Sequence, residues 1–331
     1  MAAFGTASAQ STVTITGTYN VAAQKAATGA ESIDLTDANI TFTAVEDLGG
    51  GMKATISSQI QAGGRQDISS TQGTTTTSTT AVSTATVPNQ AKVDGVYGRN
   101  ASVTLSGGFG AVSVGRLEST NTIEKAIVAP HFIPSGFDRA YLTGSKSNGT
   151  NVSYTAPAIS GFTLGFSRFT VLNAYFAPAA GAADAELSID TLGGVYANGP
   201  LTVDVVNKRY TNGSTSKGTK NEIAATYTMG PAKFGVGAQS HSGAYFLSTT
   251  NTGNTTVLSA SYLIAPQITL GLTNARRADG AGITGAKGVA YTAEYALSKR
   301  TQLNATAAKM QKAGDTANNY NQYRLGIKST F

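Results

Sequence analysis

Few side chains of this 331-residue chain could carry out chemistry of their own. There is no cysteine, which excludes disulfides and thiolate metal sites, and the two histidines, His131 and His241, leave little scope for a metal site. A serine hydrolase needs a base beside its nucleophile and a third group that orients the base, and neither histidine has such a motif around it. The sequence therefore predicts a protein that is not an enzyme and uses no cofactor and no metal.

The charged side chains are the remaining candidates. One long polar segment, 118–148, carries both signs of charge, with the acidic residues Glu118, Glu124 and Asp138 and the basic residues Lys125, Arg139 and Lys146. Elsewhere the cations behind the net charge of +6 are scattered, without the basic cluster or stacked aromatic residues of a nucleic-acid-binding surface. We therefore expect no nucleic acid partner. The role of the charged side chains depends on the secondary-structure elements that position them.

The composition predicts that those elements are strands in a membrane. Only 13% of residues are charged, well below the quarter usual in soluble domains, yet the mean hydropathy of −0.07 is not that of a helical membrane protein. The sequence has no run of about 18 apolar residues, which a spanning helix would need. Lipid-facing and lumen-facing residues that alternate along barrel strands average to such a profile.

The end of the chain has this alternation. Tyr323, Leu325, Ile327 and Phe331 share one parity, and polar residues fill most of the other, so the last nine residues predict a strand with one apolar face. Similar segments of about 9–12 residues recur, and we count sixteen in total, enough to cross a bilayer at a tilt sixteen times. The first is Thr12–Ala22, the second ends at Glu46, and the third begins at Met52.

The connections between these segments are of two kinds. Seven short ones lie at 47–51, 107–110, 157–161, 198–200, 229–231, 265–266 and 298–299, and all but the last carry Gly, Pro or Asn, the residues that tight turns need. Eight longer polar ones lie at 23–33, 63–93, 118–148, 171–186, 212–219, 243–253, 278–286 and 311–319. The fold class predicted is therefore all-β: a sixteen-stranded antiparallel transmembrane β-barrel with short periplasmic turns, long extracellular loops and both termini on the short-turn side. A β-solenoid or adhesin stalk is the soluble alternative, but no fixed repeat is visible.

The first nine residues form a separate unit. Small residues at Ala7 and Ala9 precede Gln10, a pattern that a signal peptidase cuts after. We interpret residues 1–9 as the remnant of a signal peptide and 10–331 as a single barrel domain. The alternative is the remnant of a tag.

Four stretches resemble the general Gram-negative outer-membrane porins, especially those of the betaproteobacterial and neisserial type. They are Val45–Ala54, Arg99–Arg116, Asn151–Phe162 and the last turn and strand, from Leu297-Ser-Lys-Arg-Thr to Phe331. The likeness spans nearly the whole chain, and the stretches fall in the family order.

The resemblance implies a homotrimer in the bacterial outer membrane, in contact with lipid and lipopolysaccharide. Each barrel would be a water-filled pore for ions and small hydrophilic solutes. Phe331 would serve as the signal read by the β-barrel assembly machinery. The third outer loop, 118–148, would fold into the lumen and oppose its acidic groups to arginines on the wall, a transverse field that sorts solutes by charge.

The wall departs from the family pattern. By parity Asn39, Asn100 and Ser153 face the lumen where relatives commonly carry arginine, so we predict a weak transverse field. Arg99 and Arg116 have outward parity unless a bulge re-aims them, and each could be structural or line the pore. Further lumen-facing charges are Lys53, Asp204, Lys208, Glu222, Glu294, Arg324 and Lys328.

Two other functions stay open. A substrate-specific outer-membrane channel would have the same fold, and an adhesin or structural barrel would have exposed loops but no open lumen. The sequence favours a general pore, with cations at its outer rim (Lys25, Arg65, Lys92, Arg168, Arg276, Arg277 and Lys312) that raise the local anion concentration.

Overall fold

The computed structural model describes residues 11–25, 31–62, 96–118, 121–130, 148–171, 187–212, 216–243, 253–278, 285–312 and 315–331. The predicted signal-peptide remnant, residues 1–9, lies outside the described residues. None of the helices in these ranges is long and apolar enough to cross a membrane.

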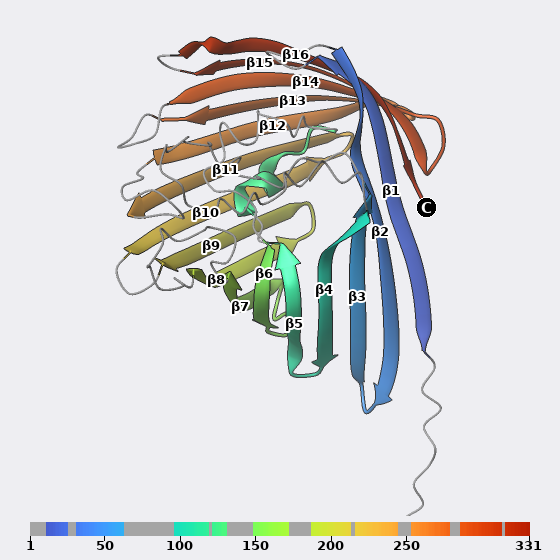
Figure 1. The fold of residues 1–331 in the computed structure, drawn as a ribbon, viewed down its shortest axis with the longest axis vertical. Helices are drawn as coiled ribbons and strands as arrows, with labels where there is room; N and C mark the ends of the chain where they lie inside the picture. The colour runs from blue at the N-terminus through green and yellow to red at the C-terminus, as the bar shows by residue number, and fades with distance from the viewer. Residues whose placement is uncertain are drawn as a thin grey trace, which may run out of the picture.

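The sixteen predicted segments are sixteen strands (Figure 1). They are β1 (Thr12–Lys25), β2 (Glu31–Gly49), β3 (Met52–Ala62), β4 (Val96–Gly107), β5 (Gly110–Glu118), β6 (Asn148–Thr155), β7 (Phe162–Val171), β8 (Leu187–Asn198), β9 (Leu201–Asn212), β10 (Ser216–Met229), β11 (Ala232–Gly243), β12 (Gly253–Ala265), β13 (Ile268–Arg277), β14 (Ala286–Ala296), β15 (Thr301–Lys312) and β16 (Asp315–Thr330). One short 3-10 helix, η1 (Thr122–Ala126), follows β5.

The strands form a closed barrel. Each pairs antiparallel with its neighbours in sequence, and β16 pairs with β1, in a register that sets Ile327 opposite Val21 and Lys328 opposite Asn20. The predicted sixteen-stranded antiparallel barrel is thus confirmed. Closure leaves no unpaired edge, which is the condition for strands to cross a bilayer, because no water there could satisfy free backbone groups.

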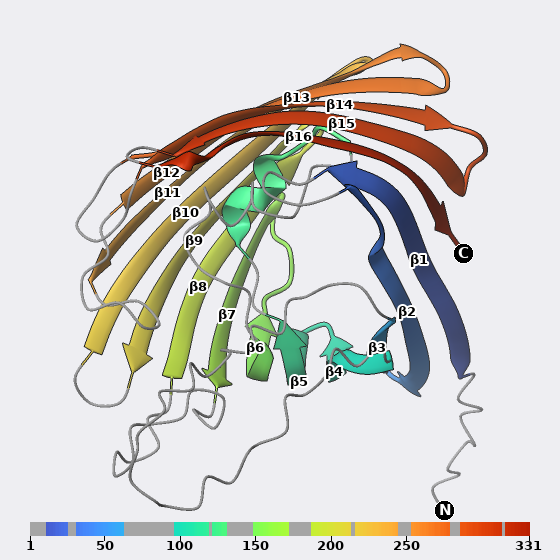
Figure 2. The ribbon, with the colours of Figure 1, turned by 45° about the horizontal axis from the view of Figure 1, so that its top comes forward.

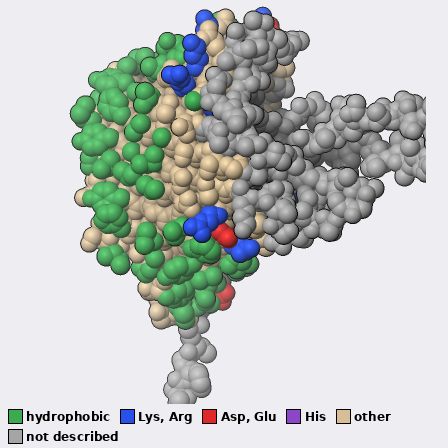
Figure 3. Space-filling model, turned by 90° about the vertical axis from the view of Figure 1, so that its left-hand side faces the viewer, with side chains coloured by type: hydrophobic (Ala, Val, Ile, Leu, Met, Phe, Trp, Pro, Cys, Tyr) green, Lys and Arg blue, Asp and Glu red, His purple; other side chains and the backbone are tan. Residues whose placement is uncertain are grey.

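The outer face of the wall is apolar. Val13, Leu164, Leu192 and Leu325 are between 61% and 69% exposed, and hydrophobic side chains spread over the face in Figure 3, with basic ones confined to a few places. An exposed apolar surface of this extent is not found on soluble monomers and suits contact with lipid tails. The inner face carries Gly, Ala, Ser, Thr and the polar residues described below.

The strands extend further than predicted at the outer rim. The loops expected at 23–33, 212–219 and 311–319 are wrong in length, because β1 continues to Lys25, β10 begins at Ser216 and β16 begins at Asp315. The residues that extend the strands are polar, which hid them from a search for apolar alternation. Cross-strand pairing satisfies their backbone groups, so the sheet continues beyond its apolar band.

The seven short turns lie where they were expected. In the β2–β3 turn Gly49, Gly50 and Gly51 all have φ between +60° and +79°, a region that costs other residues energy. The Asp47 carboxylate accepts a hydrogen bond from the Gly49 N–H at 2.9 Å and fixes the start of this turn.

The terminal residue joins the two ends of the sheet. Phe331 and Gly17 exchange two backbone hydrogen bonds, 3.0 and 3.1 Å long, and the Phe331 ring stacks on Tyr19 with ring centroids 6.3 Å apart. The ring lies flat over Gly17, so that a methyl group there would come within 2.2 Å of it. The glycine therefore makes room for the terminal aromatic across the β1–β16 seam.

We expect Gly17→Leu to destabilise this seam by about 1–3 kcal/mol, because the ring must leave its place against the wall. The measurement is the urea midpoint of unfolding of the refolded barrel in detergent. Gly108→Ala, at a turn glycine with no atom within 4 Å of an added methyl group, is the control. Equal midpoints for both variants would show that the seam does not depend on this contact.

Candidate functional site

The chain turns inward after β5. Residues Asn121–Pro130, with η1 at their centre, lie inside the barrel against β10, β11 and β12 (Figure 2). We call these ten residues the inward segment. The prediction that 118–148 folds into the lumen concerns this stretch and 131–147, which lies outside the described residues together with His131, Asp138 and Arg139.

Small wall residues make the groove in which the inward segment lies. A methyl group on Gly235 would come within 1.9 Å of the Ala126 carbonyl oxygen, and one on Gly237 within 2.8 Å of the Ile123 side chain. A methyl group on Gly271 would come within 2.6 Å of the side chains of Ala129 and Pro130. Because these positions have no Cβ, the backbone of the segment can approach the wall closely.

Apolar contacts fill the groove. Ile123 and Ala126 are fully buried and form one cluster with wall alanines and Val257 on neighbouring strands. This buried apolar cluster lies inside the barrel, where the rest of the wall is mainly polar. It removes the apolar face of η1 from the water of the lumen.

A buried ionic group on β10 holds the start of η1. The Lys220 ammonium donates to the Asn121 side-chain oxygen at 2.5 Å and lies 3.3 Å from the Glu222 carboxylate, which also contacts Lys208 at 3.0 Å. The side chains of Lys220 and Glu222 are 0% exposed. Removing Glu222 would leave the buried Lys220 ammonium without this counter-charge, which costs about 3–5 kcal/mol.

The far end of the inward segment is held by a hydroxyl group. The Ser259 oxygen accepts hydrogen bonds from the backbone N–H groups of Val128 and Ala129, each 3.1 Å long, and is 2.9 Å from the Thr273 hydroxyl. The segment is thus attached to the wall at both ends and along its apolar face. Its position depends on β10–β13, far along the chain from β5.

Arg99 faces the lumen because of a β-bulge. The pairing of β3 with β4 passes from Gln59–Asn100 to Ile60–Gly98 and leaves Arg99 as the extra residue. The bulge reverses its outward parity. Its guanidinium donates to the Glu118 carboxylate through Nε at 3.0 Å and through Nη2, and to the Asn39 oxygen at 3.3 Å.

Amide side chains continue this network along the wall. The Asn100 oxygen accepts from the Glu118 backbone N–H at 2.7 Å, the Asn100 amide donates to Gln59 at 2.9 Å, and Gln59 donates to Thr41 at 3.3 Å. Asn39 also donates to the Asp37 carboxylate. The root of the inward segment is therefore tied to β2, β3 and β4 mostly through neutral groups, with Arg99 and Glu118 as one ion pair.

On the opposite side the segment presents Lys125, which forms an ion pair with Asp204 on β9. Glu124 accepts a hydrogen bond from the Asn121 amide at 3.1 Å and so stabilises the first turn of η1. Each of these charges has an opposite charge or a hydrogen-bond donor next to it. Among the described residues near the segment, positive and negative charges thus alternate at short range.

The other predicted site residues lie apart from this network. Arg324 is 5% exposed on the inner wall of β16, near Asp37, and Lys328 follows on the same face toward the inner end. Lys53 lies beside the β2–β3 turn, opposite Asp47 and Ser106. Ser153 lies on the inner face of β6, and Glu294 accepts from Gln302 at 2.8 Å.

The candidate role of Arg116 at the constriction needs correction. Arg116 is exposed and shares the parity of Val112 and Val114, which are 38% and 48% exposed on the outer face. No bulge interrupts β5, so the side chain points away from the lumen. Arg99 therefore faces the lumen and Arg116 faces outward, although both have outward parity in the sequence.

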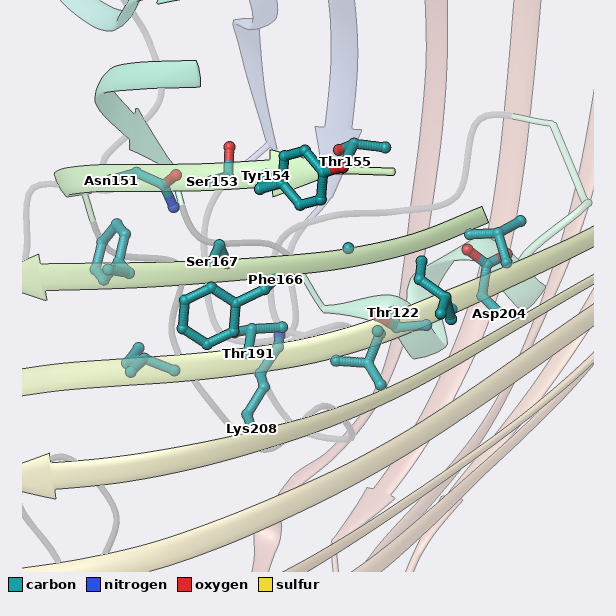
Figure 4. A pocket seen from close by; sticks show the side chains of 18 of the residues that line it. Thr122, Asn151, Ser153, Tyr154, Thr155, Phe166, Ser167, Thr191, Asp204 and Lys208 are labelled. Atoms are coloured by element: carbon teal, nitrogen blue, oxygen red, sulfur yellow. The ribbon is translucent and has the colours of Figure 1, made fainter. Parts of the chain in front are cut away.

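A cavity of about 500 Å³ lies between the inward segment and the wall (Figure 4). Leu117, Glu118, Asn121, Thr122 and Lys125 line it on one side. Strands β6–β9 line the other side, with Ser153, Ser167 and Thr191 on successive strands and Asp204 and Lys208 beyond them.

Sequence reasoning missed the residues that hold the segment. Asn121, Lys220, Ser259 and the groove glycines were not proposed as site residues, although the parity of β10 and β11 assigns Lys220 and the glycines to the inner face. The clustering of Gly235 and Gly237 on one face was the available signal. No three His, Asp or Glu side chains of the described residues come together in a way that could hold a metal ion.

Comparisons with known proteins agree on one family. The family model for Gram-negative porins matches residues 1–315. Among solved structures, the chain is similar to the anion-selective porin of Comamonas acidovorans, at 20% identity and a TM-score of 0.72, over 97% of this chain and 100% of that one. Comparison with curated protein sequences gives no match.

Two further structures have the same fold at lower identity. The trimer form of OmpT from Vibrio cholerae is 13% identical, with a TM-score of 0.68 over 97% of this chain and 99% of that one. OmpF of Salmonella typhi, in complex with daunomycin, is 12% identical, with a TM-score of 0.68 over 96% of this chain and 97% of that one.

We expect Lys220→Met to loosen the inward segment, because Asn121 loses its donor and Glu222 loses one of its two cations. Single channels in a planar bilayer should then show at least about twofold more open-channel current noise and a higher mean conductance. The expectation rests on the loss of the buried hydrogen bond to Asn121, because Glu222 keeps Lys208 as a counter-ion. In the double variant Lys220→Met/Glu222→Leu, Lys208 loses the Glu222 carboxylate as well, and the noise should rise further.

Lys233→Met is the matched control, since Lys233 is a lumen-facing lysine near the inner turn of β11 that makes no described contact with the segment. It changes the charge of the lumen by the same amount. If both single variants behave alike, the effect is one of charge and the anchor has no role.

Proposed function

Because the chain belongs to the Gram-negative porin family, we propose that it forms a general diffusion pore with weak charge selectivity. It is an outer-membrane channel for ions and small hydrophilic solutes. The family and the fold indicate a channel rather than an enzyme. What is proposed here is how its constriction treats charge.

The observation that carries the proposal is the short-range pairing of charges at the inward segment. Arg99 pairs with Glu118, Lys125 with Asp204, and Lys208 and Lys220 with Glu222. An ion in the lumen feels two opposite charges a few ångströms apart, whose fields largely cancel. A transverse field needs the two signs on opposite sides of the opening, in a low-dielectric surround.

The neutral wall positions support the same conclusion. Asn39, Asn100 and Ser153 occupy the places at which arginines would face the acidic residues of the loop, and the first two serve as hydrogen-bond partners of Arg99 and Glu118. Arg324 and Lys328 are wall cations on the distant β16. We propose that they give the lumen a mild preference for anions.

The outer rim adds a second, salt-dependent influence. Arg276, Arg277, Lys25 and Arg168 are cations there, and the last two lie 3.8 and 3.6 Å from Glu31 and Asp190. Arg65 and Lys92 lie outside the described residues, as does the side chain of Lys312. Rim cations raise the local anion concentration, and mobile ions screen them within about 10 Å at 0.1 M salt. The similar Comamonas acidovorans protein is described as anion-selective, which accords with the sign that we propose.

The assembly we propose is a homotrimer, in keeping with the trimer form of the similar OmpT. Arg116, exposed on the outer face of β5, is a candidate for the contact between subunits. We propose Phe331 as the signal for the β-barrel assembly machinery, and outer-membrane lipid and lipopolysaccharide as the surroundings of the apolar band. Chemical crosslinking of the purified protein followed by denaturing electrophoresis tests the trimer.

Reversal potentials under a tenfold salt gradient test the weak selectivity. We expect a small potential with the sign of anion preference, which falls further when both salt concentrations are raised. Strong anion selectivity that persists at high salt would contradict the proposal, because a screened rim and paired charges cannot produce it.

Installing a wall arginine should create the missing field. We expect Ser153→Arg to raise the ratio of chloride to potassium permeability by about two- to threefold, since the new guanidinium would stand in the cavity with no carboxylate assigned to it. Ser153→Gln, of similar length and no charge, should leave the ratio unchanged. A rise in both variants would point to a change in pore shape instead.

A further inference from the structure

A row of hydroxyl side chains crosses six strands on the inner wall. The cross-strand register runs from Thr55 through Thr104, Ser113, Ser153 and Ser167 to Thr191. We call these six residues the hydroxyl row. Lys208 on β9 is the next residue in register after Thr191.

The hydroxyl row rises from the inner toward the outer side of the wall as it crosses the strands. Thr55 lies close to the inner turn that precedes β3, whereas Thr191 lies near the outer start of β8. Rows of paired residues climb in this way because barrel strands are tilted and staggered. Successive hydroxyls are about 4.8 Å apart, the spacing of strands, so a solute with several hydroxyl groups could bond to two or three of them at once.

Part of the hydroxyl row is free to bind. Thr104 donates to Ser113 at 3.0 Å. The hydroxyls of Ser153, Ser167 and Thr191 have no hydrogen-bond partner among the described residues. All three line the cavity opposite the inward segment. A hydroxyl can both donate and accept, which suits it to the hydroxyl groups of a solute.

A glycine leaves a recess beside these hydroxyls. Gly165 on β7 and Gly193 on β8 are paired in register, share the inner face with Ser167 and Thr191, and line the same cavity. A methyl group on Gly165 would make only ordinary contacts, the nearest at 3.5 Å from the Tyr154 carbonyl oxygen, whereas one on Gly193 would come within 3.1 Å of the Val206 side chain. The wall therefore has room for an added group at Gly165, beside its free hydroxyls, and not at Gly193.

The charges around the recess favour a neutral solute. Lys125 is paired with Asp204, Glu118 with Arg99, and Lys208 with Glu222. Each charged side chain that lines the cavity therefore has an opposite charge close by. An anion would have to compete with a carboxylate for each cation, whereas a neutral polyol can bond to the free hydroxyls of Ser153, Ser167 and Thr191.

We propose that Ser153, Ser167 and Thr191, with the recess at Gly165, form a weak binding site for neutral polyhydroxylated solutes, the sugars and polyols. The site rests on the proposed pore and gives it a preference among the solutes that it passes. A cavity of about 500 Å³ accommodates one or two sugar rings. Weak binding is what a channel requires, since a solute must also leave.

Blockade of single-channel current tests the site. Maltose is added to the bilayer chamber at rising concentration, with a polyethylene glycol of matched hydrodynamic radius and inorganic phosphate as separate probes. We expect maltose alone to reduce the current in a saturable way. The variant Ser153→Ala/Ser167→Ala/Thr191→Val should raise the half-saturating maltose concentration by about threefold or more.

A second variant fills the recess without removing a hydroxyl. Gly165→Leu should weaken the maltose blockade to a similar extent, because the new side chain occupies the open space. Ser57→Ala/Ser102→Ala is the control, since these lumen-facing serines pair with each other on β3 and β4 away from the cavity. Its half-saturating concentration should stay that of the parent protein.

The outcomes separate the site from the pore. A folded barrel that carries no current overturns the proposed pore and this site with it. Normal conductance in which maltose and the polyethylene glycol act alike, or saturable blockade by phosphate but not by maltose, overturns the site alone. So does an unchanged maltose response in both the triple variant and Gly165→Leu.

Discussion

Closure of the hydrogen-bond ladder is the constraint on which the rest of this structure depends. In a bilayer every backbone N–H and C=O must find its partner within the protein, so β16 has to meet β1 and the sheet can have no free edge. Once the sheet is closed, alternate residues of each strand face either lipid or lumen. The pairing of Phe331 with Gly17 completes the ladder and covers the seam with an aromatic ring.

The site is built where this alternation is modified. At Arg99 an extra residue interrupts the ladder and turns a guanidinium from the lipid side to the lumen, where it meets Glu118 and Asn39. On the far wall glycines at inward positions let the inward segment approach the backbone of β11 and β13. The bulge holds the root of the segment, and the glycine groove holds its middle. Together they define a cavity between the segment and β6–β9.

The electrostatics follow from the same arrangement. Lys220 and Glu222 are held out of water because η1 covers them. Their pairing fixes the position of the segment on the wall, which non-directional apolar contacts alone would not do. The charges that might have set up a field across the lumen are used instead as local pairs. What remains accessible on the wall of β6–β8 is a set of hydroxyls and glycines, and these give the cavity its neutral, hydrogen-bonding character.

Much of this could be predicted from the sequence, because alternation is a local property. The sixteen strands, their inner and outer faces and the neutral residues at 39, 100 and 153 all follow from a repeat of two residues, which needs no knowledge of distant parts of the chain. The extension of β10 and β16 into polar residues was missed, since pairing with a neighbour, rather than apolar character, keeps those residues in the sheet.

Only the tertiary structure decided which way Arg99 and Arg116 point and which strands receive the inward segment. Their sequence parity is the same, and a bulge of one residue separates them because it depends on how β3 and β4 pair. Likewise Asn121 and Lys220 stand 99 residues apart in the chain, and the barrel brings them within a hydrogen bond. A periodic sequence specifies the faces of each strand. Closure, register and the filling of the lumen depend on all strands at once, and so does the chemistry of the site.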